Sequence, residues 1–166
     1  RVILLEMDIR KGSAKSEDGT VPAGITNYLS GKVSGIRDII RKSEWHDTLD
    51  VITSGPVPPN PAELLLSNRL DMLMEELRRE YDFILIDTVP YGVVADAQVI
   101  NRIADLCIYV IREGRFDRRL LPDVEKLYTD GRLSHMAVVL NEVCYEQAGY
   151  YGYYGYYGYG YGNKKE

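Results

Sequence analysis

The sequence predicts an α/β fold in which a mostly parallel sheet is covered by helices on both faces, followed by a flexible tail. Short continuous apolar runs alternate with segments of helical periodicity, which is the pattern of parallel strands buried on both sides. Hydrophobic residues make up 45% of the 166 residues, enough for a proper core. The end of the chain is different in kind, because it contains almost only tyrosine and glycine.

Five strands are expected from the apolar runs: Val2–Leu5, Leu49–Ile52, Phe83–Ile86, Leu106–Ile111 and Met136–Leu140. The helices expected between them are Ile25–Leu29, Ile36–Ile40, a helix after Pro61, one that begins near Asp96 and one through Leu120–Leu127. Asn60 and Pro61 suit the N-cap and first turn of the third helix. Its apolar positions recur with helical period: Leu70, Leu73, Met74, Leu77 and Tyr81.

Charge and cysteine content narrow the class of protein. The formal net charge of -5 argues against a nucleic-acid binder, which usually presents a strong basic surface. No apolar run reaches the roughly 20 residues that span a bilayer. Cys107 and Cys144 have no metal-ligand spacing. The chain also begins at Arg1, directly before an apolar run, from which we expect a further N-terminal segment in the complete protein.

Polar side chains end several of the predicted strands. Ligands in such folds bind beyond the carboxyl ends of the strands, so these side chains should converge on one edge. They are Glu6, Asp8, Asp87, Arg112 and Asn141.

Two of these strand ends carry carboxylates that can bind a metal ion or accept a proton. Asp87 can hold Mg²⁺ directly or through water, or it can simply cap the next turn. Asp8 and Arg10 alternate along the strand end and can face one side. Asp8 can then serve a metal or accept a proton, and Arg10 can neutralise phosphate charge. The alternative for this pair is a surface ion pair that contributes little.

Four segments together resemble the bacterial protein-tyrosine kinases. Residues 2–12 (VILLEMDIRKG) resemble that family's Walker A′ motif, and residues 81–90 (YDFILIDTVP) its Walker B motif. Residues 52–65 (ITSGPVPPNPAELL) resemble its Pro-Pro-Asn-Pro segment, and residues 24–31 (GITNYLSG) its Gly-Leu-Ser/Thr segment. The resemblance extends over essentially the whole chain.

The resemblance implies a P-loop ATPase fold of the deviant-Walker type, with ATP as phosphate donor, Mg²⁺ as cofactor and a tyrosine hydroxyl as acceptor. By position in the motifs, Asp8 corresponds to a metal-linked residue and general base, Arg10 to the arginine after it, and Asp87 to the Walker B aspartate. Asn141 resembles the asparagine that reads adenine in related ATPases. Glu6 corresponds to a further catalytic carboxylate of the A′ motif.

The chain departs from the family pattern at three points. Glu6 stands where the family usually has aspartate, which moves the carboxylate outward by one methylene. Val89 interrupts the usual Asp-Thr-Pro-Pro. The chain contains no Gly-x-x-x-x-Gly-Lys-Ser/Thr loop, whose backbone N–H groups and lysine cradle phosphates. We therefore expect residues 1–145 to be the C-terminal part of a kinase domain whose phosphate loop lies upstream of residue 1.

The tail, residues 146–166, resembles the family's autophosphorylation cluster. It holds eight of the 14 tyrosines, and its glycines offer little to stabilise a fold. The alternative is an adhesive low-complexity segment without an enzymatic target. The predicted phosphorylation sites are Tyr150, Tyr151, Tyr153, Tyr154, Tyr156, Tyr157, Tyr159 and Tyr161.

The resemblance also implies partners and a location. These are self-association in a ring-type homo-oligomer, a membrane adaptor domain or subunit, a tyrosine phosphatase and no nucleic acid, at the cytoplasmic face of the bacterial membrane. The implied role is the regulation of capsule or exopolysaccharide export. Two alternatives stay open: a catalytically degenerate assembly component of the export machinery, and a partition-type ATPase, which does not explain the tyrosine tail.

Overall fold

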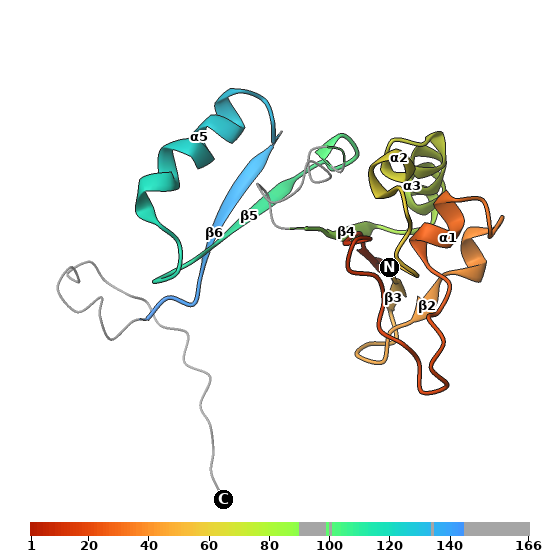
Figure 1. Cartoon of the computed structure of the whole chain (residues 1–166). Helices are drawn as coiled ribbons and strands as arrows, with labels where there is room; N and C mark the ends of the chain where they lie inside the picture. Colours follow the sequence, from red (N-terminus) through yellow and green to blue (C-terminus); the bar gives the residue numbers. More distant parts are fainter. Residues whose placement is uncertain (90–98, 100, 134, 145–166) are drawn as a thin grey trace, which may run out of the picture.

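A computed structural model describes residues 1–89, 99, 101–133 and 135–144, and Figure 1 shows the order of its elements along the chain. The strands are β1 (Val2–Glu6), β2 (Arg41–Lys42), β3 (Leu49–Ile52), β4 (Phe83–Asp87), β5 (Cys107–Arg112) and β6 (Met136–Asn141). The helices are α1 (Ile25–Leu29), α2 (Pro61–Leu65), α3 (Asn68–Glu80) and α5 (Leu121–Thr129), with 3₁₀ turns η1 (Ile36–Asp38) and η2 (Arg118–Leu120). The predicted helix start at Asp96 lies outside the described residues.

The larger sheet has four strands in the order β2-β3-β1-β4. β1 runs parallel to both β3 and β4, as the continuous apolar runs predict. β2 is antiparallel to β3 and consists of Arg41 and Lys42 alone. The sequence did not predict β2, because two charged residues carry no strand pattern and the strand exists only through its pairing with β3.

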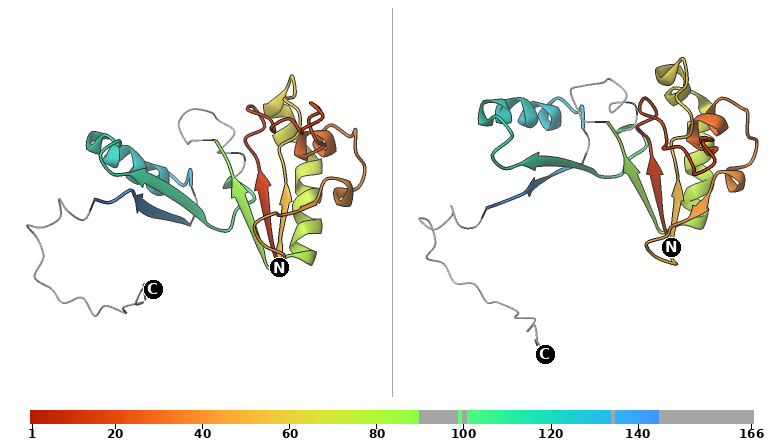
Figure 2. Two further views of the ribbon diagram at one scale, coloured as in Figure 1. Left: turned by 90° about the horizontal axis from the view of Figure 1, so that it is seen from below. Right: turned by 60° about the horizontal axis from the view of Figure 1, so that its bottom comes forward.

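The smaller sheet contains β5 and β6, which are parallel and paired from Cys107↔Met136 to Arg112↔Asn141. α5 lies between them in the chain and forms the crossover that parallel strands require. Both views in Figure 2 show this unit beside the four-stranded sheet, on the β4 side. Within the described residues, the five predicted parallel strands are therefore present but are divided between two sheets.

The core lies between the four-stranded sheet and the helices α1, α2 and α3. The buried residues at its centre include Ile3, Leu5, Leu70, Leu73 and Leu77, each at most 1% exposed. Full burial of an aliphatic side chain of this size contributes about 1.5–3 kcal/mol. The predicted helical stripe from Leu70 to Tyr81 is thus confirmed as the face of α3 that packs on the sheet.

The segment after Asn60 forms two helices where the sequence suggested one. Asn60 is the N-cap of α2 and Pro61 its first residue, as predicted. The helix stops after Leu65, and the Ser67 hydroxyl donates to the Leu64 carbonyl oxygen (2.6 Å) while Ser67 becomes the N-cap of α3. Side-chain hydrogen bonding of this kind competes with a continuous helix.

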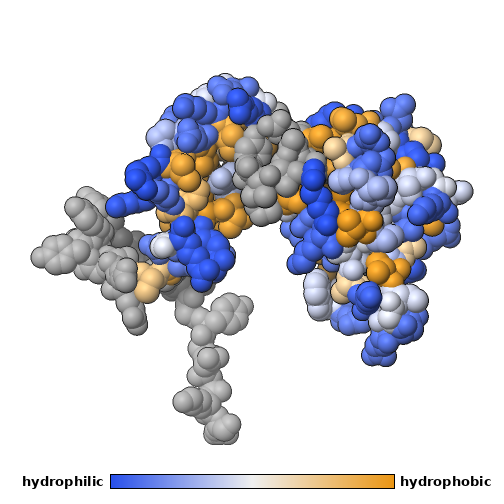
Figure 3. All heavy atoms as spheres, in the orientation of Figure 1, coloured by the Kyte–Doolittle hydropathy of each residue, from blue (hydrophilic) through white to orange (hydrophobic). Residues whose placement is uncertain are grey.

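The opposite face of the sheet is bare among the described residues. On β4, Phe83 and Leu85 are 67% and 53% exposed, whereas Ile84 and Ile86 pack against the core. Figure 3 shows further apolar residues exposed over the smaller sheet. Ile108 and Val110 of β5 are 61% and 55% exposed. The described helices therefore cover only one of the two faces that the sequence predicts to be covered. None of them is long and apolar enough to cross a membrane.

Candidate functional site

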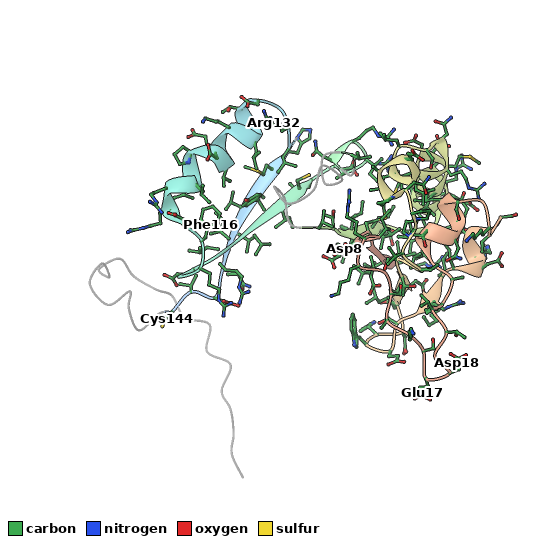
Figure 4. The ribbon with its side chains drawn as sticks, in the orientation of Figure 1. Asp8, Glu17, Asp18, Phe116, Arg132 and Cys144 are labelled. Atoms are coloured by element: carbon green, nitrogen blue, oxygen red, sulfur yellow. The ribbon has the colours of Figure 1, made fainter. Side chains whose placement is uncertain are left out.

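Three predicted site residues lie together where β1 ends. Exposure alternates without interruption from Val2 to Arg10, so Met7 and Ile9 are buried at 3% and 1% exposure. Glu6 and Asp8 are half-buried and Arg10 is exposed. Figure 4 shows Asp8 at the end of the larger sheet, beside β4. The apolar residues anchor the segment and leave the two carboxylates and the guanidinium on its accessible side.

β4 brings Asp87 to the same place. Glu6 pairs with Asp87 in the parallel register, and the Met7 amide donates to the Asp87 carbonyl oxygen (2.7 Å). Residues that pair directly in a sheet project to the same face. The Glu6 and Asp87 side chains therefore project from the face opposite α1, α2 and α3, and Asp8 lies two residues beyond the end of β1.

Two threonines follow the strands that lie on either side of β1. Thr53 follows β3 and Thr88 follows β4, so they stand on either side of the β1 end. The Oγ1 atom of each is buried and has no hydrogen-bond partner among the residues that the structure describes. Because an unsatisfied buried hydroxyl is costly, both oxygens are suited to meet a bound polar group. The prediction of site residues missed them, although a threonine directly after a strand was a usable signal.

A tight turn follows Asp8 and leads into the next loop. The amides of Lys11 and Gly12 both donate to the Asp8 carbonyl oxygen, at 3.3 and 3.4 Å. Gly12 has a φ of 72°, which glycine adopts without steric cost. Arg10 lies within this turn and is presented toward solvent.

The donor set suits Mg²⁺ that arrives with a nucleotide. No group of three or more His, Cys, Asp or Glu side chains suited to a metal occurs within the described part of the chain. Magnesium, however, is usually held by one or two carboxylates together with substrate phosphates and water. Asp8 and Asp87 are oxygen donors of this kind. The site therefore fits Mg²⁺ bound to a nucleotide better than a metal bound by protein alone.

Asn141 does not lie in the four-stranded sheet that carries Glu6 and Asp87. It ends β6, pairs with Arg112 of β5 and accepts from the Glu113 amide through its carbonyl oxygen (3.0 Å). Arg112 forms an ion pair with Glu142. Because β5 and β6 form a separate sheet, the convergence predicted for all five strand-end residues is seen for Glu6, Asp8 and Asp87. The predicted phosphorylation sites, Tyr150 to Tyr161, lie outside the described residues.

Comparison with known proteins identifies relatives across most of the chain. No family model matches. The tyrosine-protein kinase YwqD of Bacillus subtilis is 34% identical over 157 residues, which are 91% of this chain and 65% of YwqD. The tyrosine-protein kinase Wzc of Salmonella typhimurium is 34% identical over 160 residues, 91% of this chain and 22% of Wzc. The chain thus spans less than two thirds of these relatives.

Solved structures agree with these relatives. The kinase domain of VpsO superposes with a TM-score of 0.73 at 30% identity, over 86% of this chain and 70% of that domain. The septum site-determining protein MinD of Pyrococcus horikoshii, complexed with Mg-ADP, has a TM-score of 0.59 at 19% identity over 84% of this chain and 56% of its own, which supports the fold alone. This chain is a member of the bacterial tyrosine-protein kinases and has their P-loop ATPase-like fold.

Proposed function

We propose that the protein is an ATP-dependent protein-tyrosine kinase that phosphorylates the tyrosine cluster at its own C-terminus. The observation that carries the proposal is the pairing of Glu6 with Asp87 on neighbouring parallel strands, with Asp8 and Arg10 on the accessible side of the same strand end. This arrangement offers carboxylates for Mg²⁺ and for a proton, and a cation for phosphate.

Each residue has a distinct role in the proposed transfer. The Asp8 carboxylate accepts the proton of the tyrosine hydroxyl, whose oxygen forms a bond to the γ-phosphorus while the bond from that phosphorus to the β–γ bridging oxygen breaks. ADP leaves with the electron pair of that bond. Arg10 offsets charge on the transferring group, and Asp87 holds Mg²⁺. The metal, when bound, draws charge from the phosphate oxygens.

The phosphate cradle belongs, in this proposal, to a segment upstream of residue 1. Two features support the assignment: the chain has no Gly-x-x-x-x-Gly-Lys-Ser/Thr loop, and it covers only 70% of a related kinase domain. β4, which carries Asp87, is the last strand of its sheet and has a bare face. We place residues 1–145 in the kinase domain and 146–166 in its tail.

The wider setting follows from the family. We include in the proposal a homo-oligomer in which one subunit phosphorylates the tail of another, a membrane adaptor and an opposing tyrosine phosphatase. The location is the cytoplasmic face of the membrane, and the process is capsule or exopolysaccharide export. Each phosphate adds a charge of about -1.5 to -2, so a modified tail would repel neighbouring subunits and favour disassembly.

A second candidate is a catalytically degenerate assembly component. Glu6 favours it, because the family usually has aspartate there and a longer side chain changes the geometry available for metal and proton. This candidate keeps the tail as a contact segment and removes its role as a substrate.

Incubation of the complete protein with Mg·ATP, followed by mass spectrometry of residues 146–166, separates the candidates. The kinase proposal expects phosphate on the tail of the wild type and a loss of about 10²–10⁴-fold in rate for Asp8→Asn, the usual contribution of a general base. Asp18→Asn is the matched control, because Asp18 lies in an exposed loop where its Oδ1 accepts from Thr20. An unmodified wild-type tail would favour the assembly component, whereas equal phosphorylation rates for Asp8→Asn and wild type would contradict the role proposed for Asp8.

A further inference from the structure

The segment that carries Asp8 and Arg10 is held at two ends. At the first end, the Met7 amide donates to the Asp87 carbonyl oxygen of β4 (2.7 Å). At the second end, Ser13 contacts the loop after β3, on the other side of β1. The short stretch between these ends contains the proposed proton acceptor and the proposed phosphate-binding arginine. Its geometry therefore depends on both attachments.

Ser13 makes the second attachment with its backbone and with its side chain. The Ser13 amide donates to the Gly55 carbonyl oxygen (2.9 Å). In return the Gly55 amide donates to the Ser13 hydroxyl oxygen (2.7 Å). The same hydroxyl lies 3.3 Å from the Ser54 hydroxyl, which can accept its proton. The Ser13 hydroxyl oxygen thus accepts a hydrogen bond from a backbone amide, as a backbone carbonyl oxygen does between paired strands.

The loop that receives Ser13 is itself rigid. Gly55 has a φ of 81°, and a side chain there would meet the Thr26 hydroxyl at 2.7 Å. From its other side, the amides of Ile25 and Thr26 donate to the carbonyl oxygens of Thr53 and Ser54, at 2.9 and 3.0 Å. The Thr26 hydroxyl also donates to the Pro56 carbonyl oxygen (2.8 Å). Ser13 therefore ties the turn to a part of the molecule that is fixed by α1.

We propose that the Ser13 hydroxyl is a positioning residue for the kinase reaction, and that it holds the Asp8–Gly12 turn so that Asp8 and Arg10 face the transferring phosphate. This inference rests on the proposed function. Without the hydroxyl, the buried Gly55 amide loses its acceptor, and the far end of the turn keeps only the Ser13 backbone bond. A catalytic group displaced by about 1 Å can cost about a hundredfold in rate.

The test compares Ser13→Ala, Ser13→Thr and Ser16→Ala in the complete protein. Ser16 lies in the same loop with an exposed side chain, so it controls for loss of a loop hydroxyl. For Ser13→Ala we expect kcat for tail phosphorylation to fall about tenfold to a hundredfold, while the KM for ATP stays close to the wild-type value. Ser13→Thr keeps the hydroxyl and should recover most of kcat, and Ser16→Ala should match the wild type.

Hydrogen exchange supplies a readout that does not depend on activity. In Ser13→Ala the amides of Lys11, Gly12 and Gly55 should exchange faster, while those of β1 and α3 stay protected. Three outcomes would each overturn the positioning role. The Ser13→Ala variant could be fully active, or exchange at the three amides could be unchanged. The third outcome is that the variant loses both its ATP affinity and its exchange protection throughout the domain. A wild type that transfers no phosphate would instead overturn the proposed function.

Discussion

At the scale of single residues, Asp50 shows how a charge is accommodated inside this fold. It lies on β3 with a side chain that is 4% exposed, near the end of the sheet opposite Asp8. Lys42 Nζ stands 2.7 Å from Asp50 Oδ1, and the Tyr81 hydroxyl donates to Asp50 Oδ2 (2.7 Å). Arg1 also approaches Oδ2 (3.5 Å) and stacks over the Tyr81 ring. A buried carboxylate is tolerated here because Lys42 brings a positive charge to one of its oxygens and the Tyr81 hydroxyl donates to the other.

The surroundings shift the pKa values of both Asp50 and Tyr81. Burial raises the pKa of Asp50, but hydrogen bonds from Lys42 and Tyr81 and the charge of Lys42 outweigh it, so the pKa lies below its usual value. Burial, the hydrogen bond to Asp50 and the charge of that carboxylate raise the pKa of Tyr81 to about 12. The neutral phenol and the ionised carboxylate are thus the forms that the folded state prefers.

Tyr81→Phe should lower the free energy of unfolding by about 1–3 kcal/mol at neutral pH, because a buried carboxylate loses a donor. The raised pKa of Tyr81 means that its contribution is complete below about pH 10 and is lost as the pH rises toward 12. The lowered pKa of Asp50 means that its contribution is present above about pH 4 and is lost as the pH falls further. Urea unfolding across this pH range should show the alkaline loss in the wild type and not in Tyr81→Phe.

Tyr128→Phe is the control for that experiment, since Tyr128 is 59% exposed on α5. It should leave both the stability at neutral pH and the alkaline limb unchanged. Equal effects of the two substitutions, or identical pH profiles for Tyr81→Phe and the wild type, would contradict the role assigned to the Asp50 cluster.

At the scale of elements, the N-terminus of α1 depends on glycine. Gly24 is the N-cap of α1, and a β-carbon there would lie 2.5 Å from the Gly55 backbone nitrogen and even closer to the Thr53 carbonyl oxygen. Backbone atoms on both sides cannot yield as a flexible side chain can. α1 therefore approaches the loop after β3 at a distance that only glycine permits.

Gly24→Ala should destabilise the protein by about 1–3 kcal/mol, the usual cost of overpacking. It should also lower the proposed kinase activity, because it displaces the loop that Ser13 contacts. Thermal unfolding and the tail-phosphorylation rate measure the two effects. Gly35→Ala is the matched control: Gly35 caps η1 with a φ of -101°, and its added carbon would meet only the Asp38 side chain at 3.3 Å. A Gly24→Ala protein as stable as the control would refute the close approach.

Elements with a local pattern were predictable, and elements made by pairing were not. The apolar runs located β1, β3, β4, β5 and β6, and the period of α3 identified its buried face. The stripe predicted over Leu120–Leu127 is buried at Val124 and Leu127 of α5, but Leu120 of η2 and Leu121 of α5 are each 47% exposed. Residues 36–40 form only the three-residue turn η1, and Ile36 and Ile39 are still buried. Short apolar segments predict burial more firmly than they predict the type of helix.

At the scale of the whole molecule, the described residues form an incomplete α/β layer structure. One face of the four-stranded sheet is covered by α1–α3, the other carries exposed Phe83 and Leu85, and β5–β6 stand apart with exposed apolar residues. Exposed apolar surface of this extent usually marks a surface that something else covers. The upstream segment that we propose to carry the phosphate loop is also our proposed cover for this surface.

Residues 1–166 alone should bind Mg·ATP poorly, whereas a longer protein that includes the proposed phosphate loop should bind it well. The physical reason is that Asp8 and Asp87 provide metal ligands but no backbone cradle or lysine for the phosphates. Calorimetric titration of both proteins with Mg·ATP measures the difference. Circular dichroism verifies that the shorter protein is folded, and tight binding by a folded residue 1–166 protein would contradict the prediction.

The sequence by itself determined which apolar runs form the five parallel strands, which face of α3 is buried, and that Glu6, Asp8 and Asp87 stand at the carboxyl ends of apolar strands. These features depend on periodicity and on spacing along the chain, both of which are local. Only the tertiary structure decided that Glu6 pairs with Asp87, that β2 exists, that Asn141 belongs to a separate sheet and that Ser13 is joined to Gly55. Contacts between residues far apart in sequence carry no local pattern, because they form only after the chain has brought distant backbone groups together.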